Sequence, residues 1–365
     1  MRIPLITRSE IVFLLLAALY VGISAAVAYG HGLGHRFHAL MYMNNAISMT
    51  TLLAFCYGCY ALLKVIYILL AVRPARPSRY IWAEWRRGPL NTERLLRALP
   101  VFIGFLFFFS AFTSMKQIIP GINAFSWDKQ FAALDLILHF GVAPWQILYA
   151  PFDLPLIEKA YSFFTYALNI NYNAWLVAVF AALYWQLFNK AHPVTRMQFF
   201  YAFLLTWAIN GTLIATAFSS TGPCFFERLT GSEYYEPLMD RLRAANEQFN
   251  IFAVSTQDKV WNAASRNESM VGGGISAMPS IHVSTALLFW LLARAQKNKY
   301  ERLFMIFFVL ILIGSVFLAW HYAVDGYLAI LTTYAIWQLS GWMARGLATP
   351  YAQQAPLGNP DDKVA

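Results

Sequence analysis

The stretch LFMIFFVLILIGSVFLAW, residues 303–320, decides the fold class of this 365-residue chain. Its eighteen residues carry no charged side chain, and a helix needs roughly 20 mostly apolar residues to cross the bilayer core. Hydrophobic residues make up 59% of the chain and charged residues 12%, against about 45–50% and about 25% in soluble domains. This composition excludes a soluble globular protein, and the 30 Phe, 20 Tyr and 12 Trp residues exclude a disordered chain.

Seven further apolar runs, each with at most one Lys or Arg, lie on either side of the first. They cover residues 11–29, 46–72, 98–115, 160–189, 197–220, 280–296 and 326–344. We therefore predict an all-α polytopic membrane protein with about eight transmembrane helices. Arg2 and Arg8 before the first run also fit a signal peptide, but nineteen uncharged residues favour an uncleaved anchor.

Lys and Arg residues are distributed unevenly between the two sides of the predicted spans. Sixteen fall on the side that carries both termini and nine on the other, and five of these nine lie in one long segment. The largest group is seven arginines between residues 73 and 97. By the positive-inside rule both termini are cytoplasmic. The arginines then form a cytoplasmic loop that faces anionic lipid, and they do not indicate nucleic-acid binding.

The predicted spans divide the chain into three parts. Residues 1–97 form an N-terminal transmembrane hairpin with the Arg-rich loop, residues 98–345 a six-span catalytic core, and residues 346–365 a disordered cytoplasmic tail. Two outer segments, residues 116–158 and 221–279, are too long to be simple connections. We expect an interfacial or re-entrant helix in the first segment and an amphipathic cap in the second.

Cysteine and histidine patterns do not indicate metal or redox chemistry. Cys56 and Cys59 form C-x-x-C inside an apolar run, which favours a packing role. His31, His35 and His38 would share one face of a helix, but three glycines in the same loop disfavour a helix there. We therefore expect neither a metal nor a cofactor.

Two groups of polar residues lie at the outer ends of predicted spans. The first, GGGISAMPSIH at residues 272–282, places Ser280 as a helix N-cap just before His282. Backbone N–H groups and the positive end of the helix dipole then favour an anion at this point. In the second group, WHYAVDG at residues 320–326, His321 and Asp325 are four residues apart and would share one face of a helix. A carboxylate on one imidazole nitrogen makes the other nitrogen a nucleophile or general base, although such a pair alone is more often structural.

Together these groups resemble the type 2 phosphatidic acid phosphatase superfamily of membrane phosphatases and lipid phosphotransferases. Pro279, Ser280 and His282 match its Pro-Ser-x-His motif. His321 and Asp325 match the His-x-x-x-Asp that ends its third motif. The resemblance implies that His321 attacks phosphorus to form a phosphohistidine, that Asp325 supports His321, and that His282 protonates the leaving oxygen.

Two positions depart from the phosphatase branch of that superfamily. The arginine expected six residues before His321 is replaced by Ser315. Lys116 is followed by Asn123 and Ala124 where the first motif has Arg-Pro. These departures resemble the branch of inositol phosphorylceramide synthases, which are inositolphosphotransferases, and the resemblance covers roughly residues 98–345.

The missing arginine leaves the transferred phosphoryl group without its expected positive partner. Candidate substrate-binding groups are Lys116, the Ser280 hydroxyl and the backbone amides of Gly273 and Gly274. Each has a simpler alternative: an interfacial lysine, a helix cap, or glycines that let the chain bend.

Other polar residues have structural interpretations. Asp128 and Asp135 are seven residues apart and share a helix face, where a structural role is preferred. Asn169, Asn171 and Asn173 either line a head-group pocket or form hydrogen bonds between helices.

The combined expectation is a lipid phosphatase or phosphotransferase at the outer face of the cytoplasmic membrane. A phosphorylated lipid is the substrate, and water or a lipid hydroxyl is the acceptor. The branch resemblance favours transfer of a head group. Hydrolysis of phosphatidic acid or a polyprenyl phosphate is the alternative. A lipid transporter or flippase is the rival from another class, disfavoured because the titratable residues gather at one face and no repeat is visible.

Overall fold

The computed structural model describes residues 6–87, 92–154, 160–189, 191–266, 268 and 270–348. All regular secondary structure in these residues is helical, which confirms the all-α class. Five helices are long and apolar enough to cross a membrane. They are α1 (Arg8–Gly30), α2 (Met43–Tyr67) with the π-helical η2 (Ile68–Val72), α4 (Thr92–Ile122), α7 (Tyr161–Phe188), and α8 (Pro193–Ala208) with η5 (Ile209–Ile214) and α9 (Ala215–Ala217).

The last three predicted spans are also helices. They are α13 (Ile281–Ala295), α14 (Glu301–Phe317) and α15 (Ala323–Gly346). The fifteen-residue α13 is apolar but short for a full crossing. A polytopic membrane protein is therefore supported, while the total of eight spans, the six-span core and the three-part division stay predictions. Residues 349–365, most of the predicted tail, lie outside the described residues.

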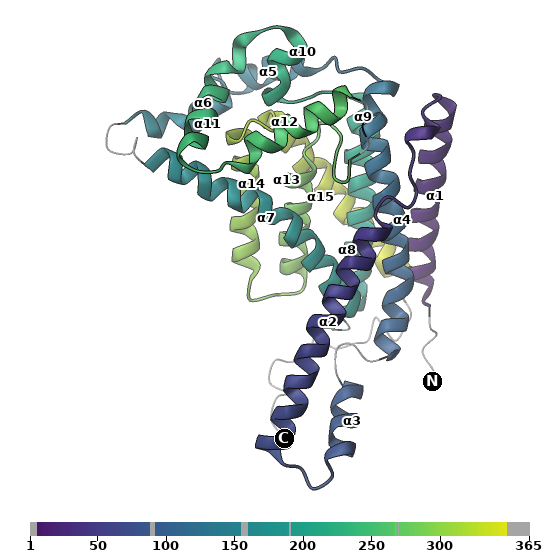
Figure 1. Cartoon of the computed structure of the whole chain (residues 1–365). Coiled ribbons are helices and arrows are strands. Elements are labelled where there is room, and N and C mark those ends of the chain that lie inside the picture. The colour runs from purple at the N-terminus through teal and green to yellow at the C-terminus, as the bar shows by residue number, and fades with distance from the viewer. Residues whose placement is uncertain are drawn as a thin grey trace.

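All the long helices except α2 form one bundle (Figure 1). Helix α1 packs along α4, α8 packs along α13 and α15, and α13 and α14 form an antiparallel hairpin that contacts α7. Aromatic rings join α4 to α8, with the Phe105 and Phe203 centroids 5.7 Å apart and those of Phe112 and Trp207 4.7 Å apart. Helix α2 and α3 (Pro77–Arg87) project from the bundle (Figure 1).

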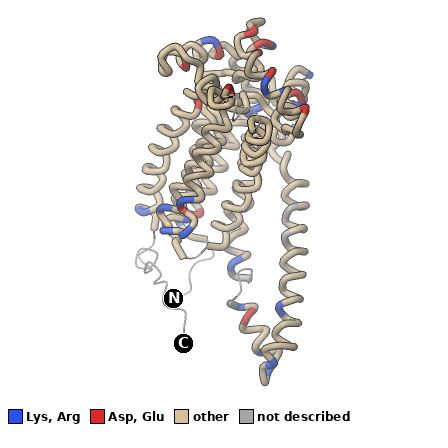
Figure 2. Tube along the Cα trace, turned by 90° about the vertical axis from the view of Figure 1, so that its left-hand side faces the viewer, with Lys and Arg blue, Asp and Glu red and all other residues tan. Residues whose placement is uncertain are grey.

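One end of the bundle joins the first and last of these helices. The Ser9 hydroxyl donates to the carbonyl of Leu347 at 3.3 Å, and the Tyr201 hydroxyl donates to the carbonyl of Ser9 at 2.7 Å. Arg196 forms an ion pair with the buried Glu10 at 3.2 Å. The start of α1, the start of α8 and the end of α15 therefore lie together, and Figure 2 shows Lys and Arg gathered at this end of the bundle.

Short helices cover the opposite end of the bundle (Figure 1). They are α5 (Asp128–Leu138), α6 (Pro144–Tyr149), α10 (Phe226–Thr230), α11 (Glu236–Gln248) and α12 (Phe252–Ser265), with short 3₁₀ turns at Gly34–Arg36, Ala150–Asp153, Pro223–Phe225 and Glu233–Tyr235. Helix α11 buries Leu238, Leu242 and Ala245, whose spacing of four and three residues defines one apolar face. The second outer segment therefore contains an amphipathic helix, and the first, where we expected an interfacial or re-entrant helix, contains the two short helices α5 and α6.

Two buried carboxylates on α5 hold the start of α15. Asp135 accepts hydrogen bonds from the backbone N–H groups of Ala323 at 2.9 Å and Val324 at 3.0 Å. These N–H groups have no partner within their own helix. Burial raises the pKa of Asp135 to about 6, and the two N–H donors oppose this shift, so the carboxylate remains mostly ionised at pH 7.

The second carboxylate, Asp128, joins α5 to two other segments. It accepts from the backbone N–H groups of Thr221 at 3.0 Å and Gly222 at 2.9 Å, and from the hydroxyl of Tyr322 at 2.8 Å. These contacts confirm the structural role that we expected for Asp128 and Asp135.

Gly222 allows the chain to lie directly on the turn before α15. Its φ is +93°, and a Cβ at this position would overlap the carbonyl oxygen of Trp320. Two residues later, the N–H of Cys224 donates to the carbonyl of Ala319 at 2.9 Å. A residue with a side chain would therefore be strained at position 222 and would displace the turn.

Replacement of Asp135 by alanine is expected to destabilise the protein. Asp135→Ala leaves two N–H groups at the start of α15 without an acceptor, so the free energy of unfolding falls by about 2 kcal/mol. Denaturant titration in detergent measures this change. Asp153→Ala, which removes an exposed partner of Arg241, is the control and costs less than about 1 kcal/mol. Equal effects of the two variants would contradict the role given to Asp135.

Gly222→Ala and Gly231→Ala form a matched pair, because both glycines have positive φ but only Gly222 faces a backbone atom. Gly231 has open space around it, so its replacement costs about 1 kcal/mol from backbone strain alone. Gly222→Ala adds the overlap with Trp320 and lowers the free energy of unfolding further. Unfolding curves of the two variants test this order, and the reverse order would disprove the proposed contact.

Candidate active site

The structure brings His282 and His321 together at the covered end of the bundle. Their ring centroids are 6.3 Å apart. His282 lies in the first turn of α13, while His321 lies in the turn between α14 and α15. Asp325, in the first turn of α15, is fully buried beside His321. The predicted residues therefore form one cluster, although the chain between the two histidines makes a complete helical hairpin.

His321 contacts Asp325, but the helical geometry that we assumed for it is wrong. Helix α15 begins at Ala323, and Tyr322 before it is extended, with φ −66° and ψ 154°. Asp325 reaches back from the first turn to the Nδ1 atom of His321 at 3.2 Å and accepts from the N–H of Tyr322 at 3.0 Å. The contact therefore arises at a helix start and not along a helix face.

The hydrogen bonds of His321 define its tautomer. The Nδ1 atom lies 2.8 Å from the carbonyl oxygen of Ala277 and 3.2 Å from Oδ2 of Asp325. A carbonyl oxygen can only accept, so Nδ1 carries the proton and Nε2 keeps its lone pair. Burial, together with the positive charge of Lys116, lowers the pKa of His321 to about 3. His321 is therefore a neutral imidazole with Nε2 available for chemistry.

Two aromatic residues of α7 contact the ring of His282. The Tyr172 ring stacks on it at 4.5 Å with an interplanar angle of 17°, and the Trp175 ring lies 4.0 Å away. Both aromatic side chains are buried. Neither residue was predicted from the sequence. Their only signal was a position close to three asparagines in an uncharged span.

Ser280 caps α13, as expected from the sequence. Its hydroxyl oxygen accepts from the N–H of Val283 at 3.4 Å. The N–H of Ser280 donates to the carbonyl of Asp325 at 3.2 Å. This second bond ties the start of α13 to the first turn of α15, so the two histidine-bearing segments are held together by backbone contacts.

Lys116, in the last third of α4, supplies positive charge to the cluster. It is half-buried, and its charge acts on both histidine rings. Within the described residues, its ammonium group has no hydrogen-bond or ion-pair partner. Gly274, with φ +96°, lies against the backbone of Lys116, where an added Cβ would come within 2.9 Å of the carbonyl. Glycine at position 274 therefore permits the loop before α13 to approach α4.

Gly273 has a different environment. Its N–H donates to the carbonyl of Met270 at 3.0 Å. Met270 is itself held by two hydrogen bonds with the side chain of Gln117, at 2.8 and 3.0 Å. The amide of Gly273 is thus engaged within the loop and is not free to bind a phosphate.

Ser315 occupies the position where the resemblance would place an arginine. It is fully buried, and its hydroxyl donates to the carbonyl of Leu312 at 2.7 Å. Its own carbonyl accepts from the N–H groups of Trp320 at 3.1 Å and His321 at 3.0 Å. Ser315 therefore shapes the turn that carries His321.

Several residues from the sequence analysis lie outside the cluster or have structural partners. Asn169 is buried, and its Oδ1 accepts from the N–H of Ala253 at 3.1 Å and from the amide of Asn173 at 3.2 Å. This arrangement favours the interpretation of Asn169 as a contact between helices. In the part of the chain that the structure describes, no group of three or more His, Cys, Asp or Glu residues is arranged to hold a metal ion.

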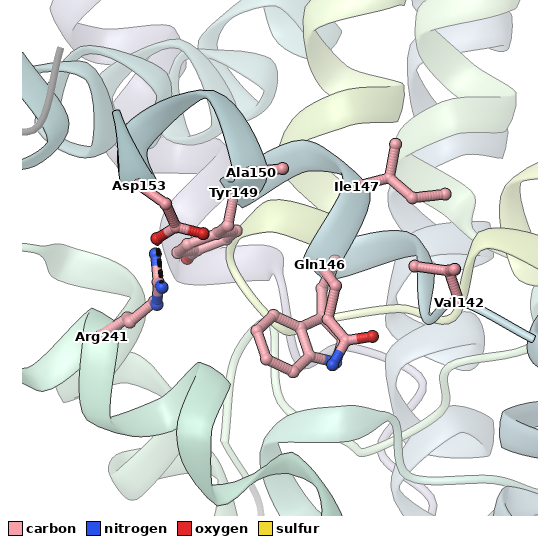
Figure 3. A pocket seen from close by; sticks show the side chains of 8 residues that line it. Val142, Gln146, Ile147, Tyr149, Ala150, Asp153 and Arg241 are labelled. Atoms are coloured by element: carbon pink, nitrogen blue, oxygen red, sulfur yellow. Dashed lines mark hydrogen bonds and ion pairs between the residues drawn. The ribbon is translucent and has the colours of Figure 1, made fainter. Parts of the chain in front are cut away.

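A separate pocket of about 520 Å³ lies between α6 and α11 (Figure 3). Arg241 and Asp153 form an ion pair of 2.6 Å at its wall, and Trp145 and Tyr149 also line it. The Tyr149 hydroxyl donates to the carbonyl of Phe317 at the end of α14. None of the residues lining this pocket belongs to the histidine cluster.

The cluster can perform nucleophilic chemistry on an anionic group. His321 presents an unprotonated Nε2, His282 is a second imidazole that can exchange a proton, and Lys116 provides a positive charge. The N-terminus of α13 adds backbone dipoles that favour an anion at the same place.

Comparison with protein families gives a match to this chain. The family model described as the PAP2 superfamily matches residues 152–344, which is more than half of the chain and includes His282, His321 and Asp325. No curated protein and no solved structure is detectably similar. The superfamily usually has phosphatase activity, so the match supports an enzyme in a membrane context that acts on a phosphorylated lipid. Because this match covers more than half of its residues, the chain belongs to the PAP2 superfamily.

Proposed function

We propose that this protein is a membrane-embedded lipid phosphatase or phosphotransferase that works through a phosphohistidine at His321. The observation that carries the proposal is the pair of acceptors on Nδ1 of His321, at 2.8 and 3.2 Å, which leaves Nε2 unprotonated. The ring of the second imidazole, His282, lies 6.3 Å from that of His321 between centroids. Superfamily membership supports a lipid phosphate as the group that reacts.

In the first step, Nε2 of His321 attacks phosphorus and a P–N bond forms. The P–O bond to the leaving alcohol breaks, and His282 gives its proton to that oxygen. The negative charge of the bound phosphate favours the protonated form of His282 before this step. Ala277 and Asp325 hold the Nδ1 proton throughout, so the imidazole keeps its orientation.

In the second step, an acceptor hydroxyl attacks the phosphohistidine. Its proton passes to His282, the P–N bond breaks, and His321 returns to its neutral form. Lys116, the Ser280 hydroxyl and the amide of Gly274 stabilise the negative charge that develops on the phosphoryl oxygens. Gly273 contributes through the shape of its loop, because its amide is bonded to Met270.

We propose transfer of a phosphorylated head group to a lipid hydroxyl, as in the inositol phosphorylceramide synthase branch that the sequence resembles. Among the described residues, Lys116 is the cation whose charge acts on both histidine rings. One positive charge matches the single negative charge of a phosphodiester, which is the linkage of a head-group donor. Hydrolysis of a lipid phosphomonoester is the second candidate, favoured by the usual activity of the superfamily.

We propose that the site faces the outer leaflet of the cytoplasmic membrane and that both termini are cytoplasmic. The support is the arrangement of charges: Lys and Arg gather at the end where α1 begins and α15 ends (Figure 2). The histidine cluster lies at the other end, beneath the short helices. This orientation follows the positive-inside rule.

His321→Ala is expected to abolish turnover, lowering it by at least about 10⁴-fold. The assay uses detergent-purified protein without added metal and a panel of phospholipids, polyprenyl phosphates and hydroxyl lipids, and it follows free phosphate and new lipid masses. Free phosphate identifies a hydrolase, and a new phosphorylated lipid without free phosphate identifies a transferase. His192→Ala, distant at the start of α8, is the control. If His321→Ala matches the wild type, or no product forms, the proposal fails and a lipid transporter becomes the better reading.

The covalent intermediate gives a separate prediction. Brief incubation of the wild type with a lipid labelled in its phosphoryl group should leave label on the protein that is stable to alkali and released by acid, as expected of a P–N bond. His321→Ala should carry no such label, whereas the His192→Ala control should retain it. Acid-stable label, or equal labelling of His321→Ala, would exclude a phosphohistidine at His321.

A further inference from the structure

Tyr172 of α7 carries a buried polar group whose role the reaction steps do not explain. The side chain is 4% exposed, and within the described residues its hydroxyl has no hydrogen-bond partner. A buried hydroxyl without a partner costs about 1–3 kcal/mol. Several other buried polar atoms of the described residues also lack a partner, so it is the stacking of the Tyr172 ring on His282 that singles out this hydroxyl.

The position of Tyr172 relates it to the missing arginine. One contact of its ring is His282, at 4.5 Å between centroids. Another is α14 at Gly314, where an added Cβ would lie 3.1 Å from the Cδ2 atom of Tyr172. Gly314 directly precedes Ser315, the position that would hold the phosphate-binding arginine. Tyr172 therefore lies against α14 beside the place where that arginine would begin.

Two other buried polar atoms around the histidines also lack a hydrogen-bond partner within the described residues. They are the indole Nε1 of Trp175 and the Oδ1 atom of Asp325. The Trp175 ring is 4.0 Å from that of His282. The Tyr172 hydroxyl and the Trp175 N–H are donors, so an anionic ligand with acceptor oxygens would satisfy both of them on binding.

We infer that the Tyr172 hydroxyl donates a hydrogen bond to a phosphoryl oxygen of the substrate and takes the place of the absent arginine. The inference rests on the proposed function, since it assumes a phosphoryl group between His282 and His321. The donor would then come from α7, whereas the arginine of the phosphatase branch would come from α14. The aromatic ring also holds His282 in place, so one side chain serves both the phosphoryl group and the proton donor.

Tyr172→Phe tests this role, because it removes the hydroxyl and keeps the ring that stacks on His282. We expect turnover to fall by about 100-fold, as for the loss of one donor to a developing oxyanion. The midpoint of thermal unfolding should stay the same or rise, because a buried hydroxyl without a partner has been removed. Wild-type turnover in Tyr172→Phe would overturn the inference. So would a loss of turnover that merely followed a loss of stability.

Orthovanadate provides a probe that does not depend on the identity of the lipid, because it adopts the five-coordinate geometry of phosphoryl transfer. We expect it to raise the thermal unfolding midpoint of the wild type and to bind Tyr172→Phe at least about 10-fold more weakly. Equal binding by the two proteins would overturn the inference.

Tyr184→Phe is the matched control, since it removes a hydroxyl twelve residues further along α7, about 18 Å away. It should behave as the wild type in both assays. His321→Ala, measured alongside, separates the two proposals. An inactive His321→Ala with a fully active Tyr172→Phe overturns the role of Tyr172 alone. A fully active His321→Ala overturns the proposed function and the Tyr172 role together.

Discussion

The site depends on two carboxylates that α5 places under the start of α15. Asp135 accepts the first two N–H groups of that helix, and Asp128 accepts the hydroxyl of Tyr322 and the backbone of Thr221 and Gly222. A helix start in a water-poor environment needs acceptors from elsewhere in the protein. By supplying them, α5 fixes the direction of α15 and the turn that carries His321.

The histidine cluster is held mainly by backbone atoms. The carbonyl of Ala277 orients His321, the carbonyl of Asp325 accepts from Ser280, and the carbonyl of Ser315 accepts from two consecutive N–H groups of the turn. Backbone contacts of this kind tolerate little movement, because each carbonyl is fixed by the helix or loop to which it belongs. His321 is therefore positioned before any substrate binds, and the rings of Tyr172 and Trp175 hold His282, as electrostatic preorganisation requires.

Composition and residue spacing predicted the features that form within a single segment of the chain. Apolar runs located the long helices, and the residues before His282 predicted the helix cap at Ser280. The contacts of Asp135 and Tyr172 could not be predicted, because their partners lie more than a hundred residues away and only the packed fold brings them together. The prediction that His321 lies on a helix was wrong because the chain forms a turn at residues 318–322. Hydrogen bonds to Ser315 and contacts with the segment around Gly222 fix this turn.

The hydrogen bond between Ser9 and Leu347 sets an order for biogenesis. Helix α1 leaves the ribosome long before α15, yet its first turn is completed by the end of α15 and by Tyr201 and Arg196 of α8. Within the described residues, the ion pair of the buried Glu10 is made with Arg196 of α8, so it can form only after α8 has been made. These contacts of the first helix can therefore be completed only when translation has passed residue 347.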